Sequence, residues 1–159
     1  MDRTIGMPWL ELRIPPPLVG LVFAGAMRAV SYAVPALSFT VPGKSGVALT
    51  FAALGAVVAL AGVSAFRLER TTVNPLNPSA SSSIVSRGIY RFSRNPQYLG
   101  ILLALAGWAV YVSNAAAALL LPVFVAYLTR YQIRPEERVL LAKFGSPFEQ
   151  YLSRVRRWI

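Results

Sequence analysis

The residues best suited to chemistry lie in two short stretches, both basic and aromatic. The first, RGIYRFSRNPQYLG at residues 87–100, gathers side chains at the start of an apolar run: Tyr90, Arg91, Arg94, Asn95 and Tyr98. Asn followed by Pro is typical of a helix start, and the other residues suit the collar of a membrane helix. A helix N-terminus also favours anions, so the stretch equally predicts a site for an anionic ligand group.

The second stretch is the acidic pair Glu136-Glu137 in the sequence RPEER. Acidic residues after a proline in the first turn of a helix complement the helix dipole, which is reason enough for them to be there. They are also two of only six acids in the chain, and they follow Tyr131 and Arg134 closely. A carboxylate pair can hold an ammonium group. The two stretches together therefore suit a nucleotide cofactor that carries an amino acid.

Several kinds of chemistry are excluded by composition. The chain has no Cys and no His, which removes disulfides, thiol nucleophiles, imidazole bases and nearly every zinc or transition-metal site. We therefore expect no metal. The net charge of +10 would suggest nucleic-acid binding in a soluble protein, but the basic residues flank apolar runs instead of forming a solvated face, so we expect no nucleic-acid partner.

The elements that must position these residues are apolar helices. The chain is 55% hydrophobic with a mean hydropathy of +0.53, as in a membrane protein. Apolar segments at residues 18–38, 46–66, 97–112 and 115–131 predict an all-α polytopic membrane protein with about four transmembrane helices. Only SNA separates the last two segments, which predicts a helical hairpin.

We expect a single membrane domain, 1–159. Residues 1–66 would form two N-terminal membrane helices, and residues 67–159 the cofactor-binding loop, the hairpin and a tail. The tail is predicted to form short cytoplasmic helices, with its last part, ending in RVRRWI, along the membrane interface.

The distribution of basic residues predicts the orientation. Fourteen lie on one side of the predicted spans: Arg3, Arg13, Arg67, Arg70, Arg87, Arg91, Arg94, Arg130, Arg134, Arg138, Lys143, Arg154, Arg156 and Arg157. Lys44 alone lies on the other side, so both termini and the site are expected in the cytoplasm. Arg28 lies inside the first span, where a charge costs roughly 2.5 to 3.5 kcal/mol, so it is expected to have a partner, to reach the interface or to serve function.

A family resemblance rests on FRLERTTVNP, IVSRGIYRFSRNPQYLG, the hairpin and RPEERVLLAKFGSPFEQYLSRVRRWI. This combination resembles the bacterial relatives of isoprenylcysteine carboxyl methyltransferases and phospholipid N-methyltransferases, over about residues 66–159. The resemblance implies a multi-pass enzyme of the bacterial inner membrane that uses S-adenosylmethionine. Its cofactor would lie on the cytoplasmic side, between the last membrane helices, the motif before the hairpin and the tail.

The resemblance also implies roles for individual residues. The family motif Arg-His/Asn-Pro-x-Tyr-x-Gly and its paired acids give the implied cofactor-binding residues: Tyr90, Arg94, Asn95, Pro96, Tyr98, Leu99, Gly100, Glu136 and Glu137. The acids would help to hold the methionine end of the cofactor. At the second motif position, isoprenylcysteine methyltransferases typically carry His and phospholipid methyltransferases Asn, so Asn95 leaves the substrate open.

The acceptor chemistry follows from what methyl transfer requires. The protein must position the acceptor and exclude water. A carboxylate acceptor needs no general base, whereas an amine must lose a proton. We expect a lipophilic, carboxylate-bearing, isoprenylcysteine-like acceptor from the bilayer, with Arg91 or Arg134 as its clamp and Arg134 and Glu137 as catalytic residues.

Other functions remain as alternatives. One is methylation of a phospholipid or another small lipophilic amine or thiol, and another is noncatalytic lipid binding. A transporter is disfavoured because no acid lies in an apolar segment. A nicotinamide-dependent sterol reductase, which shares a related helical arrangement, would need a longer chain.

Overall fold

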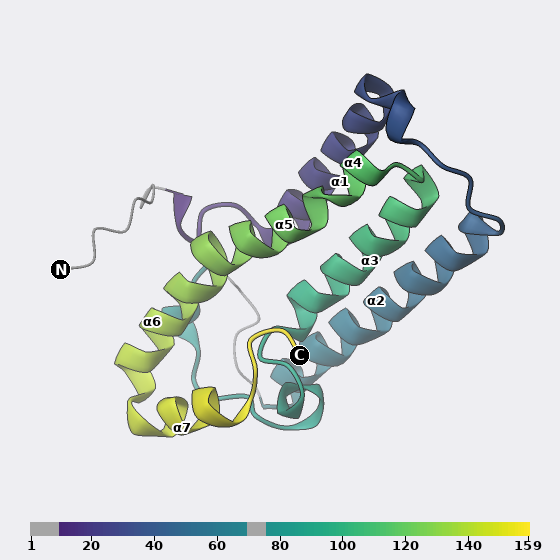
Figure 1. Cartoon of the computed structure of the whole chain (residues 1–159). Helices are drawn as coiled ribbons and strands as arrows, with labels where there is room; N and C mark the ends of the chain where they lie inside the picture. Colours follow the sequence, from purple (N-terminus) through teal and green to yellow (C-terminus); the bar gives the residue numbers. More distant parts are fainter. Residues whose placement is uncertain (1–9, 70–75) are drawn as a thin grey trace.

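The computed structural model describes residues 10–69 and 76–159, and the expectations that rest on Arg3 or Arg70 lie outside them. The described residues form helices joined by turns (Figure 1). The longer helices are α1 (Pro16–Ala33), α2 (Lys44–Leu68) and α3 (Pro96–Val112). A nearly continuous helix follows, made of α4 (Ala115–Ala118), α5 (Leu120–Leu128), the π-helical turn η5 (Thr129–Ile133) and α6 (Arg134–Phe144). The chain ends with α7 (Ser146–Arg154), and short 3-10 turns occur at η2 (Pro35–Leu37), η3 (Pro78–Ala80) and η4 (Gly88–Arg91).

Two helices in the described part of the chain are long and apolar enough to cross a membrane, namely α2 and the 30-residue helix Ala115–Phe144. α3 is apolar but shorter. The all-helical fold is confirmed for the described residues, whereas only two helices meet the criterion against the four spans expected. Only 11% of the apolar window of α2 is buried, so most of that surface lies open, as on a lipid-facing helix. Thirty helical residues extend about 45 Å, more than a bilayer core of about 30 Å, so polar α6 continues beyond the membrane.

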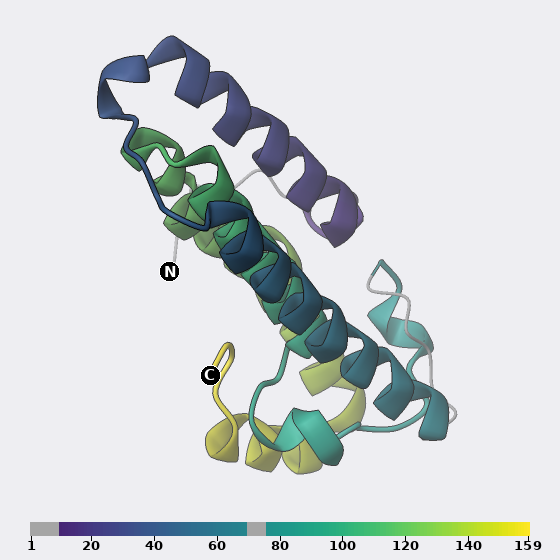
Figure 2. The same ribbon diagram turned by 90° about the vertical axis from the view of Figure 1, so that its right-hand side faces the viewer.

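Glycines bring α2 and α3 into close contact along their length, and the two helices lie side by side in both views (Figure 1, Figure 2). A Cβ added at Gly55 would lie 2.4 Å from the carbonyl oxygen of Gly100, and one at Gly100 would lie 2.5 Å from that of Gly55. A Cβ added at Gly107 would lie 2.7 Å from the Cβ of Phe51. Small residues allow membrane helices to approach this closely. The contact fixes the start of α3, which carries the first motif, against the end of α2.

The predicted hairpin turn is held by one buried amide. Ser113 has a left-handed backbone conformation, with φ of 52°, and Asn114 is fully buried. The Asn114 Nδ2 donates to the Val34 carbonyl at 2.9 Å and to the Ser38 Oγ at 3.0 Å, while its Oδ1 accepts from the backbone N–H of Ala117 at 3.0 Å. The SNA turn thus joins the hairpin to the segment after α1.

The π-helical turn has a simple cause in the sequence. Pro135 has no N–H to donate to the carbonyl of Tyr131, four residues earlier. That carbonyl accepts instead from the backbone N–H of Leu12 at 3.1 Å. The Glu11 carboxylate pairs with Arg130 at 2.9 Å and with Arg138. The segment before α1 is therefore attached to the helix where its direction changes and α6 begins.

Arg28 has an aromatic partner. Its guanidinium lies 4.3 Å from the ring centroid of Tyr32, one helical turn further along α1. The cation–π contact accounts for the charge without an acid in the same helix.

Candidate functional site

A pocket opens where the end of α2, the loop before α3, the start of α3, α6 and α7 meet. The space between its walls that no atom occupies, open solvent included, is about 820 Å³. Its lining consists of Phe66, Pro78, Ser81, Ser83, Ile84, Val85, Tyr90, Arg94, Asn95, Gln97, Tyr98, Ile133, Glu136, Glu137, Leu140, Phe144, Phe148 and Tyr151. The two stretches that the sequence singled out therefore border one pocket.

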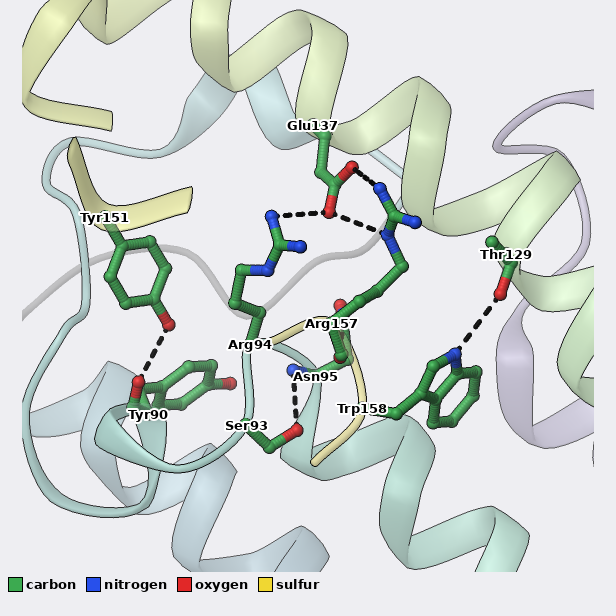
Figure 3. Close-up of polar contacts among 9 residues, drawn as sticks. All are labelled: Tyr90, Ser93, Arg94, Asn95, Thr129, Glu137, Tyr151, Arg157 and Trp158. Atoms are coloured by element: carbon green, nitrogen blue, oxygen red, sulfur yellow. Dashed lines mark hydrogen bonds and ion pairs between the residues drawn. The ribbon is translucent and has the colours of Figure 1, made fainter. Parts of the chain in front are cut away.

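The carboxylate of Glu137 is held by two arginines (Figure 3). Arg94 Nη1 lies 3.1 Å from Oε1, and Arg157 donates through Nε to Oε1 at 3.1 Å and through Nη2 to Oε2 at 2.7 Å. A guanidinium that binds both carboxylate oxygens has the favourable fork geometry of this pair. The bond to Glu137 raises the pKa of Arg157. Both oxygens of Glu137 are thus already bound within the chain.

Glu136 has a different environment although it is the next residue. Its Oε2 accepts a hydrogen bond from the Tyr98 hydroxyl at 3.0 Å. None of the ion pairs among the described residues involves Glu136. Burial raises its pKa to about 7, against a smaller lowering by the Tyr98 bond, and the charge of Glu137 adds to the increase. Glu136 is therefore a carboxyl group in the pocket with no cationic partner among the described residues.

Aromatic side chains form another part of the pocket wall. Tyr90 and Phe66 make an edge-to-face contact with ring centroids 5.3 Å apart. Tyr151 donates its hydroxyl to the Tyr90 carbonyl at 2.9 Å, which joins α7 to η4. Burial raises the pKa of Tyr90, and the charge of Glu136 raises it further. Both tyrosines are therefore neutral near pH 7 and offer ring faces and hydroxyls.

The last five residues, 155–159, fold back over the start of α3 and α6, and we call them the C-terminal strap. Its main-chain carbonyls accept from the Arg94 N–H, at Arg156 (3.1 Å), and from the Asn95 Nδ2, at Arg157 (2.8 Å). The indole N–H of Trp158 donates to the Thr129 Oγ1 at 3.2 Å, and its ring packs on the core. Figure 3 shows Arg157 directed toward Glu137 and Trp158 toward Thr129. The position of the tail along the membrane interface stays a prediction.

Asn95 and Pro96 stand at the helix start as predicted, but Asn95 does not cap the helix with its side chain. The side-chain amide instead binds the strap, and the backbone N–H of Asn95 donates to the Ser93 Oγ at 3.2 Å. The predicted N-cap and N1 positions of Asn95 and Pro96 are confirmed, while the side chain of Asn95 binds the strap, more than sixty residues away in sequence.

The expected cofactor residues divide into two groups. Those in the pocket lining are Tyr90, Arg94, Asn95, Tyr98, Glu136 and Glu137. Outside it are Pro96, Leu99 and Gly100, and Gly100 packs on α2. The expected acceptor residues Arg91 and Arg134 are exposed and also lie outside the lining.

Sequence reasoning missed Arg157 and the lining residues from the loop and α7. The loop carried a signal, since turn-rich NPLNPSASSS is long for a connection without a function. No signal in the sequence pointed to Arg157, because nothing distinguishes it from the other arginines of the basic tail.

Two buried polar atoms test whether a polar cofactor fits. The Arg94 Nε and the Ser83 Oγ have no hydrogen-bond partner among residues 10–69 and 76–159, and both residues line the pocket. A buried donor without a partner costs free energy unless a ligand or water satisfies it. The pocket also has an aromatic wall and the carboxyl group of Glu136, which forms no ion pair among the described residues. Together these groups fit a ligand that carries an anionic group, a cationic group and a flat ring.

Comparison with known proteins identifies the family. The model of the phospholipid methyltransferase family matches residues 44–146, and the chain belongs to this family. This confirms the resemblance inferred from the two motifs.

Two relatives extend the comparison. An uncharacterized protein of Haemophilus influenzae is 37% identical over 62 residues, which are 39% of this chain and 98% of that protein. The protein-S-isoprenylcysteine O-methyltransferase of Schizosaccharomyces pombe is 31% identical over 72 residues, which are 45% of this chain but 30% of that protein. No solved structure matches the chain significantly. Family and fold together indicate a membrane protein of the methyltransferase class.

Proposed function

We propose that the protein binds S-adenosylmethionine in this pocket and methylates a lipophilic acceptor. The observation that carries the proposal is the meeting of two motifs 38 residues apart at one pocket, through the Tyr98–Glu136 hydrogen bond and the Arg94–Glu137 ion pair. Family membership supplies the reaction class.

The lining residues match the groups of this cofactor. When bound, S-adenosylmethionine supplies an electrophilic methyl group on a positively charged sulfur. The unpartnered Arg94 Nε suits a carboxylate, and Ser83 suits a hydroxyl or ring acceptor. Glu136 suits the ammonium group, since it is the lining carboxylate without an ion pair in the described structure. The Tyr90 and Phe66 rings suit the adenine.

The rest of the lining supports a lipophilic acceptor, because apolar side chains contribute much of it: Ile84, Val85, Leu140, Phe144 and Phe148. We retain a carboxylate-bearing acceptor as the first candidate, because it needs no proton acceptor and Glu136 is assigned to the cofactor. The similarity to an isoprenylcysteine O-methyltransferase agrees with this choice. Arg91 and Arg134, which are exposed and lie outside the pocket lining, remain the proposed acceptor residues.

An amine acceptor is the second candidate, and the family description favours it. It would need a residue to take its proton, and Glu136, with a pKa of about 7, can do so near neutral pH. With a carboxylate acceptor, Glu136 binds the ammonium group of the cofactor. With an amine acceptor, Glu136 takes the proton of the amine.

One experiment tests the function and separates the acceptors. Purified protein is incubated with methyl-labelled S-adenosylmethionine and a bacterial lipid extract, and the labelled lipid is treated with base. Release of volatile label identifies a methyl ester, while retained label identifies a methylated amine. Calorimetric titration with S-adenosylhomocysteine should show binding. Folded protein that binds none at millimolar concentration would contradict the proposal and leave a noncatalytic lipid-binding role.

We further propose that the pocket faces the cytoplasm from the inner membrane of a bacterium. The bias of basic residues toward the pocket end of the helices supports this orientation. A lipophilic or lipidated substrate would then enter from the bilayer while the cofactor comes from the cytoplasm.

A further inference from the structure

The C-terminal strap lies beyond residues 44–146, the part that the family model matches. It nevertheless contacts both motifs of the site. Its carbonyls bind the backbone of Arg94 and the side chain of Asn95, and its one inward-facing guanidinium, on Arg157, binds Glu137. The strap therefore connects the start of α3 to α6 at the edge of the pocket.

The charges at this edge are shared in a specific way. Glu137 accepts from Arg94 on one oxygen and from Arg157 on both. Its donors therefore come from the loop before α3 and from the strap. Because Arg94 reaches Glu137 through Nη1 alone, its Nε is left without a partner in the described structure and lies buried at the pocket. The ion pair thus holds the guanidinium so that one N–H remains available to a ligand.

The two acids cannot then have the same role. Arg157 satisfies Glu137 on both oxygens. Glu136, at the neighbouring helix position, accepts from the Tyr98 hydroxyl and forms no ion pair in the part of the chain that the structure describes. A cationic ligand group gains more from a carboxylate without a cation than from one that two arginines already neutralise.

We infer that Arg157 is a positioning residue, which holds Glu137 and through it Arg94, and that Glu136 alone of the two acids contacts the cofactor. This inference rests on the proposed function. It replaces the expectation that Glu136 and Glu137 both hold the methionine end of the cofactor. It also makes the strap necessary for cofactor binding.

Five variants of the 159-residue chain in detergent test the inference, two of them at Glu136 and Glu137. Arg157→Ala removes the fork, and Arg157→Lys keeps the charge but not the bidentate geometry. Arg156→Ala is the matched control, since it removes the same charge from an exposed neighbour whose contact uses its backbone. Strap docking is measured without cofactor, as the rate at which carboxypeptidase Y trims the C-terminus, followed by mass spectrometry. Affinity for S-adenosylhomocysteine is measured by calorimetry.

We expect Arg157→Ala to be trimmed about fivefold faster than the wild type, because docking no longer protects the strap. We expect its S-adenosylhomocysteine affinity to fall about tenfold, with Arg157→Lys between the two and Arg156→Ala unchanged. Glu137→Gln should also weaken binding yet keep the pH dependence of the wild type, whereas Glu136→Gln should lose that dependence.

Faster trimming of Arg157→Ala with unchanged affinity would overturn the inference, since the strap would then be structural only. Loss of the pH dependence in Glu137→Gln would overturn the division between the acids. If Arg157→Ala does not fold, the Arg157→Lys and Glu137→Gln comparisons decide. Absence of binding to the folded wild type would instead overturn the proposed function, and the inference with it.

Discussion

At the scale of single residues, neighbouring acids have acquired different surroundings. Successive helix positions differ by about 100° around the axis, so Glu136 and Glu137 meet different parts of the protein. One carboxyl group is buried beneath Tyr98, and the other is ion-paired with Arg94 and Arg157. Their surroundings differ for that reason. Glu136, whose pKa burial raises to about 7, should control the pH dependence of the site.

We expect affinity for S-adenosylhomocysteine to rise between pH 6 and 7 and to level off above about pH 7.5. The pKa of Glu136 is raised to about 7, so below that pH the carboxyl group is increasingly protonated and loses its attraction for an ammonium group. The limiting slope is about tenfold per pH unit. Calorimetry at several pH values measures it, and a profile that stays flat in the wild type would remove Glu136 from the cofactor contacts.

Replacing Tyr98 by Phe should move this profile upward in pH. The Tyr98 hydroxyl stabilises the ionised carboxylate and lowers its pKa, so its removal raises the pKa of Glu136. At pH 7 the variant should bind more weakly, and at pH 8.5 it should approach wild-type affinity. A uniform loss at all pH values would show that the hydroxyl acts on the ligand directly.

At the scale of elements, the contact between α2 and α3 decides where the first motif stands. Gly55 and Gly100 allow the two backbones to meet, and Gly62 packs on Pro96 at the first turn of α3. This places Gly100 at a helix interface outside the pocket lining. Its match to the family motif therefore has a packing explanation in this chain.

We expect Gly100→Ala to destabilise the protein by about 1 to 3 kcal/mol, because the added Cβ would lie 2.5 Å from a backbone oxygen and the helices must separate. Thermal unfolding in detergent measures the change. Gly25→Ala is the matched control, since a Cβ there meets nothing within 4 Å. Equal stability of the two variants would show that the helices can adjust.

At the scale of the whole molecule, polar chemistry is concentrated at one end. In Figure 1, α6, α7 and the C-terminus lie toward one end of the helices, while α4 and the turn after α1 lie at the other. Residues of α6 and α7 line the pocket, and Asn114, which precedes α4, binds the segment after α1. Between them, α2 exposes an apolar surface. This arrangement suits a protein whose middle is in the bilayer and whose site is at one surface.

The orientation can be tested with cysteines, since the natural chain has none to give a background. We expect Ser45→Cys, near the start of α2, to react with a membrane-impermeant maleimide in bacterial cells with a permeabilised outer membrane. Ser153→Cys, in α7 at the pocket end, should react only after the inner membrane is disrupted. Both residues are exposed in the structure. The reverse pattern would place the pocket outside the cytoplasm.

The sequence by itself determined the helices, the hairpin and the two motifs, because these depend on local properties: apolar length, prolines at helix starts and the spacing of charged residues. Membership of the family followed from the same motifs. Which of the predicted site residues line the pocket did not follow from the motifs, since Gly100, Arg91 and Arg134 lie outside the lining.

Only the tertiary structure decided that Arg157 binds Glu137, that Asn95 binds the strap and that Glu136 forms no ion pair within residues 10–69 and 76–159. These contacts join residues that are between 20 and more than sixty positions apart in the sequence. The chain has several arginines that could pair with either carboxylate, so the sequence alone does not assign the pairs. Which arginine reaches which carboxylate depends on how the chain folds back, and the hydrogen bonds of Tyr151 and Trp158 hold it in that position.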